Sequence, residues 1–134
     1  HAEKADDDPR DPSLSATGRE RAARLAERLR DAPLVAAWSS DYRRTRDTAA
    51  TAAAPHDMPI RIYDAREPAD ALAARLRAEH DRGTVLVVGH SNTVPAIVAA
   101  LCGCAVEPLG EDDYDRWFEV APDIDGGSTE VSRY

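Results

Sequence analysis

The sequence predicts a three-layer α/β/α fold with a mainly parallel sheet, because short apolar runs alternate with helical patterns along the chain. Three of these runs are each followed or preceded by a stretch with apolar residues every three or four positions, which is typical of an amphipathic helix. Two later runs flank an Asp-Gly turn and predict a C-terminal β-hairpin. With 134 residues, 43% of them hydrophobic, the chain fits a single domain over residues 1–134.

The predicted strands are short runs that are rich in aliphatic and aromatic residues. Those of the main sheet are Leu34–Trp38, Ile60–Tyr63 and Thr84–Val88, and those of the hairpin are Arg116–Val120 and Ser128–Tyr134. Leu34–Trp38 and Thr84–Val88 show no alternation with polar residues, so both are expected to be buried on two faces. The hairpin turn is expected at Asp125-Gly126-Gly127.

The predicted helices are bounded by capping residues, prolines and glycines. Ser15 or Thr17 can cap the first, which runs to before Pro33 and carries Ala22, Leu25, Ala26 and Leu29 on one face. The others are expected from the caps Ser39-Ser40-Asp41 to Ala54, from Pro68 to near Gly83, and from Pro95 to Gly103.

Composition excludes several classes of protein. The net charge of −8 argues against a nucleic-acid partner, since phosphate backbones attract basic surfaces. No apolar run is long enough for a membrane span. Cys102 and Cys104 are too few for a disulfide scaffold or a structural zinc site, and we expect both to be small core residues. The start at His1 fits a soluble cytoplasmic protein as well as one exported to the periplasm after removal of a leader.

Polar residues follow the predicted strands at the ends where parallel sheets bind ligands. Ser40-Asp41-Tyr42-Arg43-Arg44 follows one strand, Gly89-His90-Ser91-Asn92 follows another, and His1 precedes the first helix. Two imidazoles, guanidinium groups and a helix N-terminus together predict an anion site, and phosphate is the anion that these groups suit best.

These segments resemble the ordered motifs of the histidine phosphatase superfamily, which has the phosphoglycerate-mutase-like fold, and in particular its small SixA-type branch. His1-Ala2-Glu3-Lys4 looks like the continuation of the family's Arg-His-Gly/Ala signature, and Leu14-Ser15-Ala16-Thr17-Gly18 like its helix opening. The segment from Ser40 to Ala49 is similar to Ser-Asp-x-x-Arg-Ala-x-x-Thr-Ala, which places the phosphate-binding arginine on Arg44. Val88-Gly89-His90-Ser91 looks like the motif with the second catalytic histidine, His90.

The resemblance also implies a hydrophobic central strand, ending in arginine, ahead of His1. Without such a strand the apolar faces of two helices would be uncovered, at about 25 cal/mol per Å² left exposed. We therefore expect an upstream strand and regard residues 1–134 as an N-terminally incomplete domain.

What the resemblance implies for function is a metal-independent phosphatase that needs no cofactor. It would hydrolyse phosphomonoesters or phosphohistidine, on a small substrate or a phosphoprotein, through a phosphohistidine on His1. Neutral histidine is a suitable nucleophile near pH 7. Arg44, or Arg43 in its place, would clamp the equatorial oxygens, and His90, if protonated, would add a positive donor.

The proton donor for the leaving group is left open between three carboxylates. The family often places it after the strand that here ends at Tyr63, where Asp64 and Glu67 lie, and Glu3 is the third candidate. Ser91, Asn92 and Glu3 are the expected substrate-binding residues, with capping of the following helix as the alternative role for Ser91 and Asn92. The acidic run Asp6–Asp8 is expected to be a solvated loop rather than a metal site.

Two other functions compete with hydrolysis. A phosphoglycerate-mutase-type phosphotransferase would share the phosphohistidine, and a non-catalytic module would bind phospho-ligands in the same pocket. Mutases must keep water from the intermediate with a lid. Only Asp64-Ala65-Arg66-Glu67 separates the strand at Ile60–Tyr63 from its helix, which favours hydrolysis.

Overall fold

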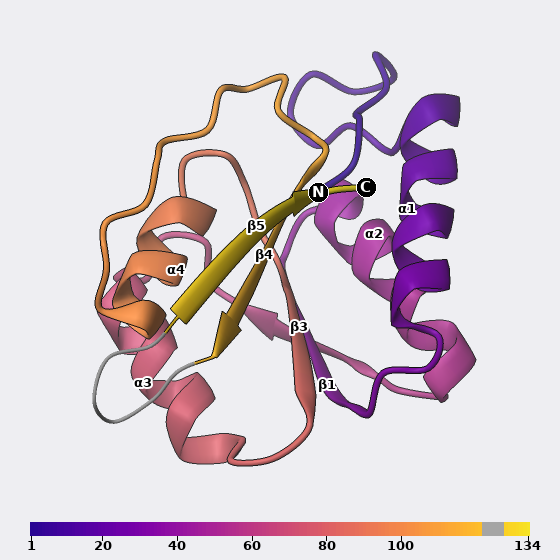
Figure 1. Ribbon diagram of the computed structural model, residues 1–134. Helices are drawn as coiled ribbons and strands as arrows, with labels where there is room; N and C mark the ends of the chain where they lie inside the picture. The colour runs from indigo at the N-terminus through magenta and orange to yellow at the C-terminus, as the bar shows by residue number, and fades with distance from the viewer. Residues whose placement is uncertain (122–127) are drawn as a thin grey trace.

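A three-stranded parallel sheet forms the centre of the computed structural model, which describes residues 1–121 and 128–134 (Figure 1). The strands are β1 (Leu34–Ser40), β2 (Ile60–Tyr63) and β3 (Thr84–Val88), in the spatial order β2-β1-β3. Both outer strands run parallel to β1, so all three strand ends that lead into helices meet at one edge of the sheet. The predicted α/β class is confirmed.

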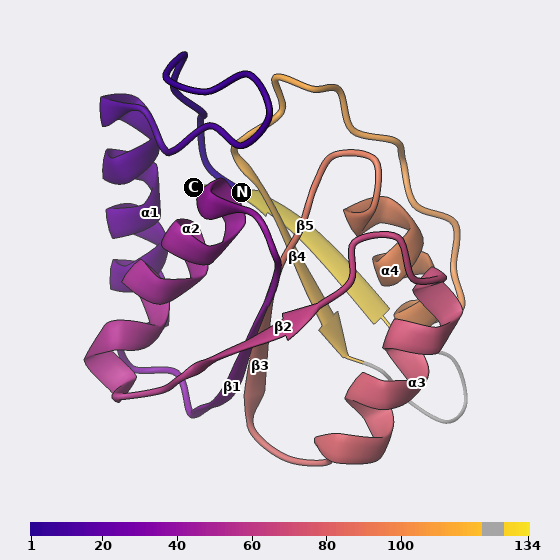
Figure 2. The same cartoon turned by 180° about the vertical axis from the view of Figure 1, so that it is seen from behind.

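Helices cover both faces of this sheet. They are α1 (Ala16–Leu29), α2 (Arg43–Ala53), the short 3₁₀ turn η1 (Ala54–His56), α3 (Ala69–Glu79) and α4 (Val94–Cys102). Front and back views agree that α1 and α2 lie on one side and α3 and α4 on the other (Figures 1 and 2). Ser15 caps α1 by accepting from the Gly18 N–H at 3.0 Å, as its sequence predicts.

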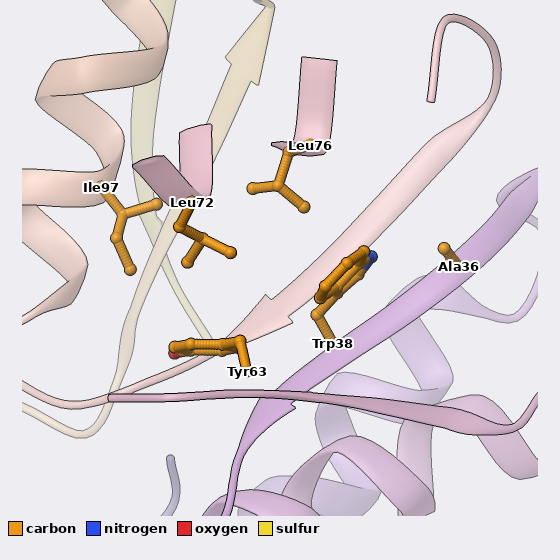
Figure 3. Close-up of a cluster of buried hydrophobic side chains, with 6 residues drawn as sticks. All are labelled: Ala36, Trp38, Tyr63, Leu72, Leu76 and Ile97. Carbon is orange, nitrogen blue, oxygen red and sulfur yellow. The ribbon is translucent and has the colours of Figure 1, made fainter. Parts of the chain in front are cut away.

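The core has one part on each face of β1. Ala36 and Trp38 point toward α3 and α4 and pack with Tyr63 and with aliphatic side chains of those helices: Leu72, Leu76 and Ile97 (Figure 3). On the other face, Leu25 and Leu29 of α1 pack against Ala52 of α2. β1 is hydrogen-bonded on both edges, and all of its residues except Val35 are buried.

One strand differs from its prediction. The apolar run at Thr84–Val88 was expected to be buried on both faces, but Thr84–Val87 are half-buried and only Val88 is buried. Within the described residues β3 lies at an edge of the sheet, and an edge strand has covering neighbours on fewer sides. An apolar run indicates a strand but not whether that strand lies at the centre or at an edge of the sheet. The strand expected ahead of His1 stays a prediction.

The expected caps of α2 are wrong. Ser39 and Ser40 belong to β1, where both are fully buried and pair in register with Ile62 and Tyr63 of β2. The residue that precedes the helix is Tyr42, which forms no side-chain capping bond. Because sheet pairing continues through Ser40, the Ser40 hydroxyl does not cap α2 and can bond another group.

The cysteine prediction is right for Cys102, which is buried at the end of α4, and wrong for Cys104, which is exposed. The two are joined by a disulfide. Gly103 between them takes a left-handed conformation (φ 63°), which ends the helix and turns the chain back on itself.

The C-terminal hairpin is present as a separate antiparallel sheet of β4 (Arg116–Ala121) and β5 (Ser128–Arg133). Its predicted turn, Asp125-Gly126-Gly127, lies outside the described residues. Trp117 of β4 packs on the Leu25 and Leu29 cluster of α1, and β4 also contacts α4.

Within residues 1–121 and 128–134, none of the helices is long and apolar enough to cross a bilayer.

Candidate active site

The N-terminal segment holds His1 at the edge of the sheet where β1 and β3 end. The backbone nitrogen of His1 donates to the Gly89 carbonyl (2.9 Å), and the Ala2 N–H donates to the Thr48 hydroxyl of α2 (3.1 Å). The segment then passes so close to α1 that a Cβ on Gly18 would lie 2.1 Å from the Glu3 carbonyl oxygen. Main-chain contacts to β3, α1 and α2 therefore fix the position of His1.

Hydrogen bonding of the His1 ring leaves one nitrogen available as a nucleophile. Nδ1 lies 2.7 Å from the Ala2 carbonyl oxygen, which can only accept, so Nδ1 carries the ring proton. Nε2 then presents its lone pair, and the Arg44 Nε donates to it at 3.3 Å. This tautomer is the one that a histidine needs for attack through Nε2.

Arg44 occupies the first turn of α2 and carries an unsatisfied buried donor. Its guanidinium carbon lies 4.8 Å from the centre of the Tyr42 ring, a cation–π contact. Its Nη1 is buried and has no hydrogen-bond partner among the residues that the structure describes. A buried donor without a partner costs about 1–3 kcal/mol, so this atom marks a place for an acceptor that the protein itself does not supply.

Arg43, the alternative to Arg44, points elsewhere. Its backbone N–H donates to the Asp11 carboxylate at 2.9 Å, and its guanidinium lies 3.7 Å from the Asp7 carboxylate. The side chain is exposed. Of the two neighbouring arginines, only Arg44 faces His1.

His90 follows β3, and its side chain is hydrogen-bonded to a residue of β1. Its Nε2 is hydrogen-bonded to the Ser40 hydroxyl (2.7 Å), which is in turn bonded to the Thr45 hydroxyl (2.8 Å). The His90 ring meets the His1 ring edge-on, with the ring centres 5.3 Å apart. Burial, reinforced by the charge of Arg44, lowers the pKa of His90 to about 4. The free site therefore holds a neutral His90 at pH 7, whereas the sequence argument considered a protonated one.

A tight turn from Gly89 to Thr93 aims His90 at the site. The His90 N–H donates to the Thr93 hydroxyl (3.0 Å), and a Cβ on Gly89 would lie 2.7 Å from the Tyr63 hydroxyl oxygen. Thr93 precedes α4, so neither Ser91 nor Asn92 caps that helix, which removes one of their two expected roles.

The two nominated phosphate ligands of this turn lie against different cavities. Ser91 lines a pocket of about 50 Å³ together with His1 and His90, whereas Asn92 is exposed and lines a second cavity of about 170 Å³ with Tyr63 and Glu67. The first pocket has room for a few water-sized groups, which is the scale of one phosphoryl group.

The opposite wall of this first pocket was not foreseen. It comes from the irregular segment Leu109–Arg116, which includes Glu111, Asp113 and Tyr114, and from Tyr134. Figure 1 shows the chain that follows α4 passing over the same end of the molecule as the N-terminal loop. No periodicity or motif in this segment could have indicated its position, because it has no regular structure.

None of the three carboxylates nominated as proton donor lines this pocket. Glu3 is paired with Arg21 at 2.7 Å. Burial opposes ionisation of Glu3, but the hydrogen bonds and charge of Arg21 outweigh it and hold the pKa of this carboxyl below its usual value. Glu67 is paired with Arg75 (2.7 Å), and the exposed Asp64 accepts from the Arg66 N–H (2.8 Å).

Two acidic residues of the N-terminal loop accept hydrogen bonds from other residues of that loop. Asp7 accepts from the Ser13 hydroxyl (2.6 Å), and Asp8 accepts from the Arg10 N–H (2.9 Å). Across the described part of the chain, His, Cys, Asp and Glu side chains form no group of three or more that could hold a metal ion.

Part of the sequence matches a known protein family. The sequence profile of the histidine phosphatase superfamily (branch 1) matches residues 2–67. This range begins directly after His1 and includes Arg44. The chain belongs to the histidine phosphatase superfamily. No curated protein matches it at a significant level.

Solved structures of histidine phosphatases share the fold. The protein histidine phosphatase SixA complexed with tungstate superposes with a TM-score of 0.82 at 19% identity, over 99% of this chain and 92% of that one. A mycobacterial glucosyl-3-phosphoglycerate phosphatase gives a TM-score of 0.71 at 20% identity, over 100% and 94%. A protein described as a phosphohistidine phosphatase SixA from Nakamurella multipartitia gives 0.60 at 28% identity, over 76% and 62%.

Sequence reasoning missed three polar residues that contact the histidines and Arg44 of the candidate site. Ser40 holds His90, Tyr42 stacks on Arg44 and has its ring centre 5.1 Å from that of His90, and Tyr114 faces His1. A signal was available for Ser40, because a polar residue at the end of a buried strand needs a partner. Nothing comparable marked Tyr114.

Proposed function

We propose that this protein is a phosphatase that hydrolyses phosphomonoesters or phosphohistidine through a phosphohistidine on His1. The observation that carries the proposal is the buried, unpartnered Nη1 of Arg44 beside the unprotonated Nε2 of His1, to which the Arg44 Nε donates. A phosphoryl oxygen would supply the missing acceptor, and it would place phosphorus next to the nucleophile. Arg44 and the two histidines thus suit a tetrahedral oxyanion better than a carboxylate or an uncharged ligand.

In the first step the lone pair of His1 Nε2 attacks phosphorus in line with the leaving group. The charge that spreads over the equatorial oxygens is stabilised by Arg44 and by the ring of His90. The Nδ1 of His90 has no partner among the described residues, since Ser40 engages Nε2. A bound phosphoryl anion favours the protonated ring, so substrate binding would raise the lowered pKa of His90.

In the second step water attacks phosphorus and releases inorganic phosphate and free His1. The same groups serve both steps, because the charge develops on the same oxygens. The SixA structure was solved in complex with tungstate, an oxyanion, which supports oxyanion binding by this fold. No residue of this chain is required to bind a metal in either step.

Two substrate classes fit the pocket. It holds one phosphoryl group and leaves the rest of the substrate outside, against the Leu109–Arg116 wall. The structural relatives include a protein histidine phosphatase and a phosphatase of a small sugar phosphate. A small phosphorylated metabolite and a phosphoprotein are therefore both proposed as partners. Only five residues, Asp64–Pro68, connect β2 to α3, which supports hydrolysis over a mutase with a lid there.

Hydrolysis of p-nitrophenyl phosphate from pH 5 to 8, with and without EDTA, tests the proposal. We expect turnover that EDTA leaves intact and that His1→Ala or His90→Ala suppresses by about 10²-fold or more. His56→Ala is the matched control, because the His56 ring bonds the Leu29 carbonyl (2.8 Å) away from the site.

The absence of turnover would overturn hydrolysis and separate the two competitors. Acid-labile phosphate on His1 after incubation with a phosphate donor would then indicate a mutase-type transferase. Phosphate binding without any labelling would indicate a non-catalytic module.

A further inference from the structure

The proposed reaction needs a proton for the departing oxygen, and the three carboxylates nominated from the sequence do not line the pocket beside His1. The carboxylates of Glu3 and Glu67 are each paired with an arginine, and Asp64 is exposed away from the pocket. What does face His1 from the opposite wall is the phenol ring of Tyr114, with its centre 5.9 Å from that of the His1 ring.

The surroundings of Tyr114 leave its hydroxyl free and protonated. The side chain is half-buried in the pocket wall, and its hydroxyl bonds no residue that the structure describes. Burial first, and then the charges of Asp112, Glu3 and Glu111, raise the pKa of this phenol. A phenol that keeps its proton throughout the neutral range is available as an acid, and it remains a stronger acid than a departing alkyl alcohol.

Two other acidic groups of the same wall are worse placed. Asp113 accepts from the Gly110 N–H (2.8 Å) and lies 3.7 Å from Arg116, so its carboxylate is occupied in holding the loop. Glu111 is exposed at the mouth of the pocket, where water surrounds it.

We propose that the Tyr114 hydroxyl is the proton donor to the leaving group in the phosphatase reaction, an inference that rests on the proposed function. As the His1 Nε2–phosphorus bond forms and the phosphorus–oxygen bond breaks, the phenol proton moves to the departing oxygen and leaves a phenolate. In the second step the attacking water returns a proton to that phenolate, and the nitrogen–phosphorus bond breaks. Arg44 is the positive charge near enough to stabilise the transient phenolate.

The dependence of the rate on the leaving group tests this role. An alkyl phosphate such as β-glycerophosphate needs a proton on its departing alkoxide, whereas p-nitrophenolate departs with little assistance. The comparison uses kcat/KM, which covers phosphoryl transfer to His1 whatever step limits kcat. We expect Tyr114→Phe to lower kcat/KM for the alkyl phosphate by about 10²-fold, and by at least tenfold more than for p-nitrophenyl phosphate.

Two control variants make the result specific. Tyr134→Phe also removes a phenol hydroxyl from the pocket wall, and Glu111→Gln removes the exposed carboxylate; both should change the two substrates by the same factor. Equal losses in Tyr114→Phe, or a selective loss in Glu111→Gln, would overturn the assignment of Tyr114. If the unsubstituted protein turned over neither substrate, the proposed function itself would fail, and this inference with it.

Discussion

The two walls of the pocket are built in different ways. The sheet-side wall includes His1 and His90, which lie at the ends of β1 and β3 and are hydrogen-bonded to Arg44 and Ser40, respectively. The loop-side wall is the irregular segment Leu109–Arg116, which is held by local bonds such as that from the Gly110 N–H to Asp113. The first wall is suited to bind the phosphoryl group, which every substrate shares, and the second to contact the part that differs.

Arg44 gives the largest expected effect on the sheet-side wall. Arg44→Ala should lower kcat/KM for p-nitrophenyl phosphate by about 10²–10³-fold, because it removes a donor to the phosphoryl oxygens. Arg43→Ala is the matched control, since Arg43 is exposed and paired with Asp7. Similar losses in both variants would contradict the placement of the site. Circular dichroism of each variant checks that the fold is retained.

Gly89 should be nearly as sensitive, although it has no side chain. Gly89→Ala places a Cβ 2.7 Å from the Tyr63 hydroxyl oxygen and 3.0 Å from the Thr93 hydroxyl, so the turn that aims His90 must shift. We expect a loss of activity of about 10²-fold from this displacement. The free energy of unfolding should fall by about 1–3 kcal/mol, as measured by urea denaturation. An active and fully stable Gly89→Ala protein would show that this wall is less rigid than described.

Ser40 and Ser39 form a matched pair within β1. Both are fully buried, but the Ser39 hydroxyl donates to the Ser40 carbonyl (2.8 Å), whereas the Ser40 hydroxyl reaches His90. Ser40→Ala should lower kcat/KM about fivefold, which corresponds to a hydrogen bond of about 1 kcal/mol. Ser39→Ala should reduce stability without a comparable loss of activity. Steady-state kinetics and denaturation of both variants decide whether Ser40 acts through His90.

The lowered pKa of His90 makes stability depend on pH. The pKa of about 4 in the folded protein lies below the usual 6.5, so between these values the unfolded chain binds more protons. Stability from this group is present above pH 6.5 and is lost as pH falls toward 4. Thermal unfolding from pH 4 to 7 should show a decline that is weaker in His90→Asn. Inorganic phosphate should reduce the decline if it binds beside His90.

Asp113 should have the smallest effect on global stability, because the loop-side wall is held locally. Asp113→Ala removes the acceptor for the Gly110 N–H, yet the free energy of unfolding should change by less than about 1 kcal/mol, since its partners are at the surface. KM is expected to rise more than kcat falls. A large destabilisation would mean that the two walls are coupled more closely than their contacts indicate.

Much of the fold and of the sheet-side wall could be predicted, because both depend on signals between residues that are close in the sequence. Apolar runs, Ser15 as a cap, and Pro and Gly at helix ends depend on neighbours in sequence, and the resemblance nominated His1, Arg44 and His90. The proton donor could not be predicted in this way. Asp64 and Glu67 follow β2, which β1 separates from β3, so the strand order places both away from the first pocket, and Glu67 lines a different cavity.

The sequence by itself determined the α/β class and the element boundaries to within a few residues, and it nominated His1, Arg44 and His90, which lie together where the strands end. Only the tertiary structure decided that β3 lies at an edge within the described residues, that Ser40 holds His90, and that Tyr114 faces His1. The physical reason is the range of the interactions. Helix and strand signals act over a few residues, whereas strand order and the path of an irregular segment depend on contacts between residues far apart in the chain.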